Sequence, residues 1–190
     1  PISKGNHTEI ISDEEVISSG LITSRIAINK GLSKAFEEND QMADDLMLLH
    51  LADEKRKEIQ EEYDKLGLNI RPLVLIQFPN GLDDWIDRIK NELTEMGYGE
   101  NTGLVTSWFS GDHPENPEEI QKLDGQYSFL LFKQAIATGW DCPRAKILVK
   151  LREGGTERFN VQTVGRIRRM PERKHYNNDL IDNCYIYTLD

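Results

Sequence analysis

Residues 73–78, Leu73-Val74-Leu75-Ile76-Gln77-Phe78, form an apolar run bounded by Pro72 and by Pro79-Asn80-Gly81. A run of this length between turn residues is typical of a strand buried on both faces of a sheet. Sheets buried on both faces are mostly parallel and have helices on each side. The stretch therefore predicts an α/β fold, and the rest of the chain can be interpreted outward from it.

Strand-like and helical segments alternate along the chain. Apolar residues three and four apart predict a long helix between residues 42 and 66, with Asn39 or Asp40 as its N-cap and Gly67 as its stop. Residues 14–28 are rich in β-branched side chains and predict two short strands. The further expected elements are helices at 82–96, 118–123 and 157–169, and strands at 104–109, 128–132, 147–151 and 185–189. This alternation predicts a mostly parallel sheet covered by helices on both faces.

Composition excludes several classes of protein. The chain has 190 residues, 38% apolar and 29% charged, so it can bury a core. No apolar run approaches the 18 or so residues of a membrane span, and the N-terminus lacks the layout of a signal peptide. Two cysteines, Cys142 and Cys184, exclude a disulfide framework and a cysteine-only zinc site. We expect a cytoplasmic protein without a metal site or a membrane partner, and the missing initiator Met indicates an excised fragment.

Charge is unevenly distributed along the chain. The formal net charge of −10 argues against a simple polyanion binder. Residues 133–174, however, hold eleven basic and four acidic side chains, a charge of +7, while the remainder carries −17. A local basic region suggests a site for phosphates. A solvated charged face would give the same pattern, so charge alone does not distinguish it from a phosphate site.

Ligands bind at the carboxyl ends of the strands in a parallel sheet. The loops that we expect at this edge are candidate sites. They lie at residues 79–81, 110–112, 133–134 and 139–141 and in the neighbourhood of 162–169.

Residues 162–169, Gln-Thr-Val-Gly-Arg-Ile-Arg-Arg, place three arginines within four positions. Such a group is costly to bury without anions. On a helix Arg166 and Arg169 would share a face, where their guanidinium groups could each donate to two phosphoryl oxygens. Gly165 has no side chain and would let a phosphate or another backbone come close. The alternative is an ordinary basic helix end.

Residues 137–145, Ala-Thr-Gly-Trp-Asp-Cys-Pro-Arg-Ala, form the second candidate segment. Gly139 and Asp141 follow a predicted strand and turn, which would hold a carboxylate at the rim of the sheet. A carboxylate there can accept two hydroxyl groups, as from a ribose. The alternative is a turn in which Asp141 caps the local backbone.

Together the two segments resemble motifs V and VI of superfamily 2 helicases. Residues 139–145, Gly-Trp-Asp-Cys-Pro-Arg-Ala, are most similar to the Res subunit of type III restriction enzymes and its relatives, and residues 73–80 stand where that family has motif IV. The resemblance covers residues 70–190, and residues 1–69 fit it as an N-terminal extension and leading helix. It implies a three-layer α/β/α RecA-like domain of the helicase C-terminal type.

The resemblance also implies roles for the matching residues. Arg166 and Arg169 would be arginine fingers that face the γ-phosphate of ATP, and Asp141 would lie near the ribose. Lys133, at a motif V position, would contact the nucleic-acid backbone. The full implied set is ATP-binding Gly139, Asp141, Gln162 and Gly165, and nucleic-acid-binding Lys133, Asn80 and Gly111. Arg168 departs from the family pattern, and its role stays open.

The sequence lacks the Gly-x-x-x-x-Gly-Lys-[Ser/Thr] loop and the acidic pair that hold phosphates and Mg²⁺. The resemblance thus implies the second motor domain of an ATP-dependent DNA helicase or translocase. ATP and Mg²⁺ would bind in the full-length protein, and the fragment alone would be inactive. The implied partners are DNA (a single strand or a duplex backbone), the first RecA-like domain and a methyltransferase (Mod) subunit. Two alternatives stay open, namely a RecA-like module that binds without hydrolysis, and another branch such as an RNA helicase or repair translocase.

Overall fold

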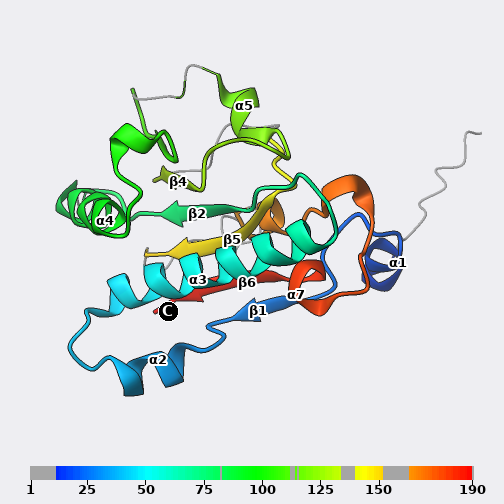
Figure 1. Cartoon of the computed structure of the whole chain (residues 1–190), viewed down its shortest axis with the longest axis horizontal. Coiled ribbons are helices and arrows are strands. Elements are labelled where there is room, and N and C mark those ends of the chain that lie inside the picture. The colour runs from blue at the N-terminus through cyan, green and yellow to red at the C-terminus, as the bar shows by residue number, and fades with distance from the viewer. Residues whose placement is uncertain are drawn as a thin grey trace, which may run out of the picture.

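A single six-stranded sheet organises the protein. The computed structural model describes residues 12–81, 83–111, 114, 116–133, 140–151 and 163–189. Every strand pair is parallel, and the strand order is β1-β6-β5-β2-β4-β3 (Figure 1). The strands are β1 (Ile26–Ile28), β2 (Leu73–Gln77), β3 (Val105–Trp108), β4 (Phe129–Phe132), β5 (Ala145–Lys150) and β6 (Cys184–Thr188). The predicted parallel sheet is confirmed, and all strand carboxyl ends lie at one edge.

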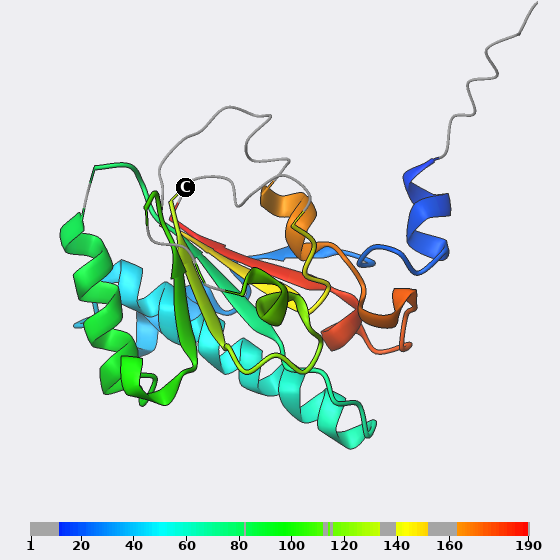
Figure 2. The same cartoon turned by 90° about the horizontal axis from the view of Figure 1, so that it is seen from above.

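Helices cover both faces of the sheet. The α-helices are α1 (Asp13–Ser18), α2 (Leu32–Glu38), α3 (Asp44–Lys65), α4 (Asp83–Glu95), α5 (Pro117–Gln121) and α7 (Asp179–Asp182), with a helical turn at 163–167 and 3₁₀ turns at Glu100–Thr102 and Pro171–Arg173. Helices α2, α3 and α4 pack on the face that we call the first face. Helix α5 and residues 163–167 pack on the opposite, second face (Figure 2). The three-layer α/β/α arrangement predicted from the sequence is therefore confirmed.

Strand β2 explains why the sheet is double-sided. All five of its residues are buried, because β5 and β4 flank it and apolar layers cover it above and below. Val74 and Ile76 point to the first face, whereas Leu73 and Leu75 point to the second. Each such side chain contributes about 1.5–3 kcal/mol when fully buried. This double burial is what the apolar run in the sequence predicts.

Helix α3 ends as predicted but begins later. The amide of Leu68 donates to the Tyr63 carbonyl at 2.9 Å, and the amide of Gly67 donates to the Asp64 carbonyl at 3.0 Å. These two bonds form a Schellman motif, which needs the positive φ of 69° that Gly67 adopts. The N-cap is Ala43 and not Asn39 or Asp40, because Asn39 instead closes α2.

The prediction of two strands at residues 14–28 is half wrong. The first segment is helix α1, and only β1 is a strand. Ser12 and Glu15 form a capping box, in which the Glu15 amide donates to Ser12 Oγ at 3.2 Å and the Ser12 amide donates to Glu15 Oε2 at 2.8 Å. This local helix-start signal outweighs the β-branched composition.

Segments on both sides of residue 70 belong to the same sheet. Strand β1 pairs with β6, and α3 packs over the strands of the first face. Among the described helices, none has both the length and the apolar composition that crossing a membrane requires.

Lys146 in β5 offers a test of this core. Its side chain is fully buried, its Nζ donates to Met170 Sδ at 3.5 Å, and burial lowers the pKa of its amine from the ordinary 10.5 to about 8. Below pH 8 the folded and unfolded chains both carry the proton, so the folded state bears the cost of a buried charge. Between pH 8 and 10.5 the unfolded chain holds more protons, so Lys146 makes the free energy of unfolding rise with pH.

We therefore expect Lys146→Met to be more stable than the wild type at pH 7, by up to about 3 kcal/mol. The difference should shrink as the pH rises from 8 towards 10.5. Urea denaturation of both proteins at several pH values measures it. A stability difference that stays constant with pH would contradict the buried, depressed amine.

Candidate functional site

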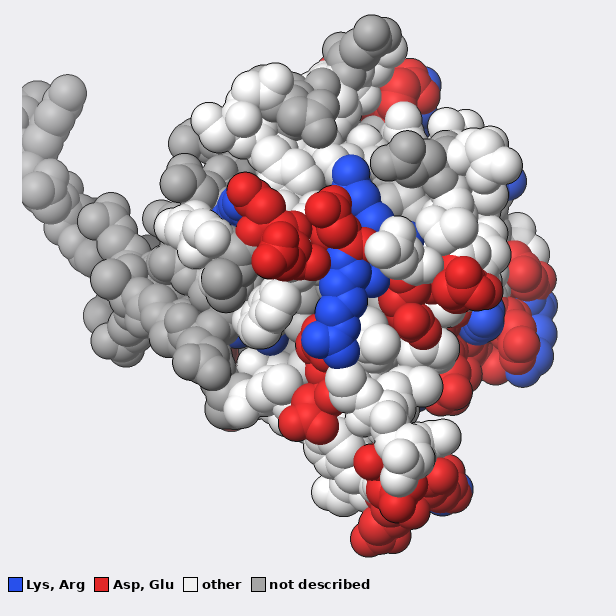
Figure 3. All heavy atoms as spheres, turned by 90° about the vertical axis from the view of Figure 1, so that its left-hand side faces the viewer, with Lys and Arg blue, Asp and Glu red and all other residues white. Residues whose placement is uncertain are grey.

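The three predicted nucleic-acid-binding residues lie at the carboxyl edge of the sheet. Asn80 follows β2, Gly111 follows β3 and Lys133 follows β4. Because β2, β4 and β3 are neighbours in the sheet, the fold brings these loops side by side. Figure 3 looks onto this side of the molecule and shows a short line of basic side chains flanked by acidic ones.

Lys133 is already engaged by an acidic side chain. Its Nζ lies 2.5 Å from Asp83 Oδ1, at the start of α4. The Lys133 side chain is 23% exposed, whereas that of Asp83 is 83% exposed. An ion pair with one such exposed partner contributes at most about 1 kcal/mol. A phosphate could therefore replace Asp83 at little cost.

The arginine segment does not form the continuous helix predicted at 157–169. Residues 163–167 are helical, but Arg168 lies in a turn and Arg169 forms an antiparallel bridge with Ile22. The Thr23 amide donates to the Arg168 carbonyl at 2.7 Å. Because the backbone of this segment pairs with residues 22 and 23, it does not form another helical turn. Arg166 and Arg169 thus do not share a helix face as predicted. Gln162 and residues 152–161 lie outside the described residues.

Arg166 is held by the loop that precedes β5. Its Nη1 donates to the Trp140 carbonyl at 2.7 Å, and its guanidinium lies 5.7 Å from the centroid of the Trp140 ring. Burial lowers the pKa of Arg166, and the charge of Asp141 partly offsets that shift. Gly165, one residue earlier, is exposed, and among the described residues no atom outside its own helical turn lies within 4 Å of where its side chain would begin.

Arg169 and Asp141 form an exposed pair. Arg169 Nε lies 3.6 Å from Asp141 Oδ1, and the two side chains are 51% and 56% exposed. Arg169 therefore already has a carboxylate partner within this domain. Residues from both sequence segments nevertheless meet on one solvent-facing surface. Gly139 lies outside the described residues.

This pair also lies farther from the carboxyl edge than expected. Asp141 precedes β5, and Ile22, the partner of Arg169, precedes β1, so both belong to the amino-terminal side of the sheet. The reason is topological. The chain leaves β5 at the carboxyl edge and must return to the amino edge before parallel β6 can begin, and residues 163–167 of this connection pack on the second face.

Arg144 is a positioning residue that the charge pattern did not reveal. It is fully buried, and its guanidinium donates to the backbone carbonyls of Ile120, Arg71 and Tyr127, each at 2.8 Å. These bonds tie the loop that carries Asp141 to the segments before β2 and β4. The sequence signal for a buried role was the position of Arg144 directly before a strand. The other basic residues nearby made Arg144 look like part of a charged surface.

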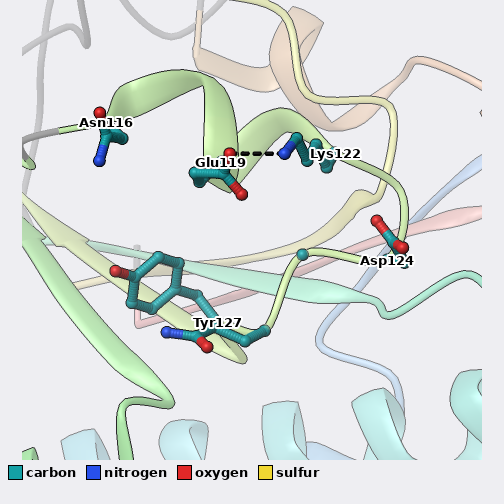
Figure 4. A pocket seen from close by; sticks show the side chains of 7 residues that line it. Asn116, Glu119, Lys122, Asp124 and Tyr127 are labelled. Carbon is teal, nitrogen blue, oxygen red and sulfur yellow. Dashed lines mark hydrogen bonds and ion pairs between the residues drawn. The ribbon is translucent and has the colours of Figure 1, made fainter.

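A pocket of about 650 Å³ lies between α5 and the loop that leads to β4 (Figure 4). Glu119 and Lys122 on its wall pair with each other at 2.5 Å. Among the described residues of the predicted ATP and nucleic-acid sets, none lines it. Within the described ranges, no three His, Cys, Asp or Glu side chains gather as metal ligands.

No family model matches the chain, and no curated protein matches it in sequence. Some solved structures are similar in fold. A variant of S. cerevisiae Dbp5 bound to a Gle1 variant and IP6 is 10% identical, with a TM-score of 0.47 over 97% of this chain and 38% of that one. The C-terminal domain of the same Dbp5 variant, bound to the same partners, is 11% identical, with a TM-score of 0.42 over 89% and 76%.

A third similar structure is the ATP-dependent Type ISP restriction-modification enzyme LlaBIII bound to DNA. It is 16% identical, with a TM-score of 0.45 over 90% of this chain and 12% of that one. The chain thus spans a minor part of two of these proteins. Similarities at this level concern the fold alone.

The backbone at Arg173 and Lys174, a few residues after Arg169, packs closely against Gly20. Gly20 has a φ of 77°, and a side chain there would come within 2.8 Å of the Lys174 Cα and 3.1 Å of the Arg173 carbonyl oxygen. Gly20→Ala should therefore be more destabilising than Gly67→Ala, which has a similar φ of 69° but open space around it. The left-handed conformation alone costs about 1–2 kcal/mol in both variants. Chemical denaturation measures the difference, and equal losses would contradict the close packing of these segments.

Proposed function

We propose that this chain is the second RecA-like motor domain of an ATP-dependent nucleic-acid helicase or translocase, most like the Res subunit of type III restriction enzymes. The observation that carries the proposal is the exposed pair of Asp141 and Arg169. These residues come from the two segments that resemble motifs V and VI, and they lie 3.6 Å apart. Lys133, Asn80 and Gly111 lie separately, at the carboxyl edge. One domain thus presents two distinct surfaces, one for a nucleotide and one for a nucleic-acid strand.

The chemistry of Asp141 and Arg169 suits an ATP site that is shared with another domain. An exposed carboxylate suits ribose hydroxyls, and an exposed guanidinium suits a phosphoryl group. ATP, with Mg²⁺, would supply the free energy for movement. This chain would contribute Asp141 and Arg169. It would also contribute Gly139 and Gln162, which lie outside the described residues. The phosphate loop and the Mg²⁺ carboxylates, which the sequence lacks, would come from a first RecA-like domain.

Arg169 would act by exchanging partners. In the free domain its guanidinium faces Asp141. In the closed enzyme it would turn to the γ-phosphate, while Asp141 would accept hydrogen bonds from the ribose hydroxyl groups. The exchange costs little, because an exposed pair of this kind is worth at most about 1 kcal/mol. The proposed partners are DNA, the first motor domain and a methyltransferase (Mod) subunit.

A second candidate is a RecA-like module that binds nucleic acid or protein without hydrolysis. The hydrogen bond from Arg166 to the Trp140 carbonyl favours this second candidate. A guanidinium held in this way stabilises the local structure. Arg169 distinguishes the two candidates, since only a motor requires it for turnover. RNA helicases and repair translocases are further variants of the motor proposal.

The isolated chain should not hydrolyse ATP, because it lacks the phosphate loop. In the full-length protein, Arg169→Ala should lower kcat about 10³-fold or more, as loss of an arginine finger does in related phosphoryl-transfer enzymes. Lys34→Ala, on the exposed outer side of α2, is the control and should leave kcat unchanged. Steady ATP turnover measures both. Full turnover by Arg169→Ala would exclude the finger assignment and leave the binding module.

Binding at the carboxyl edge should depend on Lys133 and on its acidic partner. Lys133→Ala should weaken binding equally on unrelated oligonucleotides and reduce the slope of log affinity against log salt by about 0.7–0.9. Asp83→Asn should strengthen binding, because it releases Lys133 from the ion pair. Salt titrations by fluorescence anisotropy on two sequences measure all three proteins. Loss of affinity on only one sequence would mean that Lys133 reads bases, which a translocase must not do.

A further inference from the structure

Two consecutive residues adopt a strained backbone conformation shortly after Arg169. Glu172 has a φ of 54° and a ψ of 10°, and Arg173 has a φ of 53°. Residues with a Cβ avoid this left-handed region, and the side chains that enter it most readily are those of Asn and Asp. Neither Glu nor Arg is of that kind. Such a conformation persists only where the surrounding structure imposes it, and residues of this sort gather at functional sites.

Both ends of the turn at residues 171–174 are tied to one short stretch between α1 and β1 (Figure 1). The Met170 amide donates to the Leu21 carbonyl at 3.1 Å, and His175 Nε2 donates to the Ile22 carbonyl at 2.8 Å. The two ends are thus held close together, and the chain must reverse its direction within the residues between them. We call residues 171–174 the strained turn.

Side chains hold the strained turn in place. The Tyr176 hydroxyl donates to Glu172 Oε2 at 2.9 Å, and Lys174 Nζ lies 3.2 Å from the same oxygen. These two partners lower the pKa of Glu172, so it is a carboxylate at neutral pH. Tyr176 is itself fixed, because its amide donates to buried Asp182 at 2.7 Å and its ring packs edge-to-face on Tyr63 at 6.1 Å. The Glu172 carboxylate is therefore fastened to the body of the domain.

The strained turn follows directly on the backbone that presents Arg169. Arg169 forms an isolated antiparallel bridge with Ile22, and the Thr23 amide donates to the Arg168 carbonyl at 2.7 Å. An isolated bridge fixes its segment less firmly than a full ladder does. The strained turn, which begins two positions after Arg169, supplies a further constraint. If it relaxed, Arg169 could shift relative to Asp141, which lies 3.6 Å from it.

We propose that Glu172, Arg173 and Tyr176 are positioning residues that hold Arg169 where a nucleotide can reach it. They act through the backbone, and none of them would touch the nucleotide. The inference rests on the proposed function, because it concerns the same arginine, and it adds the residues that orient Arg169 before the partner domain closes. The alternative is that the strained turn serves packing alone.

Arg173 allows the strain to be removed while the other contacts stay. Its side chain is exposed and makes no ion pair or hydrogen bond with the described residues. Arg173→Gly admits the positive φ but makes the turn flexible, whereas Arg173→Asn tolerates the same φ and keeps the turn more rigid. Both variants should raise the urea midpoint of the chain. A lower midpoint in both would show that the turn is not strained and would overturn the proposal.

Amide hydrogen exchange reports on the Arg169 segment without a nucleotide. In Arg173→Gly the amides of Thr23 and Met170, which bond across the paired segments, should exchange on the order of tenfold faster than in the wild type. Arg173→Asn should restore their protection. The Val74 amide, which donates to the Ser128 carbonyl in the sheet, is the internal control and should not change. Unchanged exchange at Thr23 and Met170 would contradict the positioning role.

Tyr176→Phe tests the hydrogen bond that holds the turn. The substitution removes the hydroxyl that binds Glu172 and keeps the ring that packs on Tyr63. It should also accelerate exchange of the Met170 amide. If the rate stays at the wild-type value, Tyr176 and Glu172 do not support the turn, and the proposal is wrong for both.

ATP turnover by the full-length protein is the second readout. Arg173→Gly should lower kcat several-fold and leave KM unchanged, because the arginine acts in the transition state, and Arg173→Asn should restore kcat. Asn177→Gly, at a φ of 57° outside the strained turn, is the matched control and should keep the wild-type kcat.

The two proposals fail separately. Full turnover by Arg173→Gly would overturn the positioning role, even where loss of turnover in Arg169→Ala supports the finger. Full turnover by Arg169→Ala would overturn the proposed function, and with it any positioning role in catalysis.

Discussion

The backbone of β2 is hydrogen-bonded on both sides to parallel neighbours, and the register of these pairs determines where functional side chains can meet. A parallel sheet puts every strand end at the same edge, so a residue's position along its strand decides its neighbours. Asn80, Lys133 and Gly111 come together because their strands are adjacent, although the sequence separates them by up to 53 positions. Slipping β2 by one residue would turn every side chain of the strand to the opposite face.

The same constraint separates the two candidate surfaces. A connection between parallel strands must return the chain from the carboxyl edge to the amino edge. Between β5 and β6, residues 163–167 pack on the second face, and Arg169 lies beside Ile22. Lys133 stays at the opposite edge, directly after β4. Within the described residues, the surface at Arg169 and the edge at Lys133 are connected through the sheet and through the loop that Arg144 anchors.

The sequence predicts the sheet well, because its central strands are buried on both faces and show continuous apolar runs. β2, β4 and β5 are of this kind, and all were predicted close to their observed positions. Helix α1 was missed because its signal is a pair of side chains, Ser12 and Glu15, within a β-branched composition. For the site, the loops after β2, β3 and β4 were predictable because they directly follow strands, whereas Asp141 and Arg169 were expected at the carboxyl edge and lie on the amino-terminal side. The partners of Lys133 and Arg169 were not predictable, because Asp83 and Asp141 approach them only through tertiary packing.

Part of the basic charge of residues 133–174 is committed inside the protein. Arg144 and Lys146 are fully buried, and Arg166 is held by a backbone carbonyl. Only part of the formal +7 is therefore available to a polyanion, within a chain whose net charge is −10. A long-range field cannot be the main source of affinity, because it is screened over about 8–10 Å at physiological salt. The binding that we propose at the carboxyl edge would then depend on donors placed at contact distance, and the adjacency of β2, β4 and β3 in the sheet brings the loops of Asn80, Lys133 and Gly111 to that edge together.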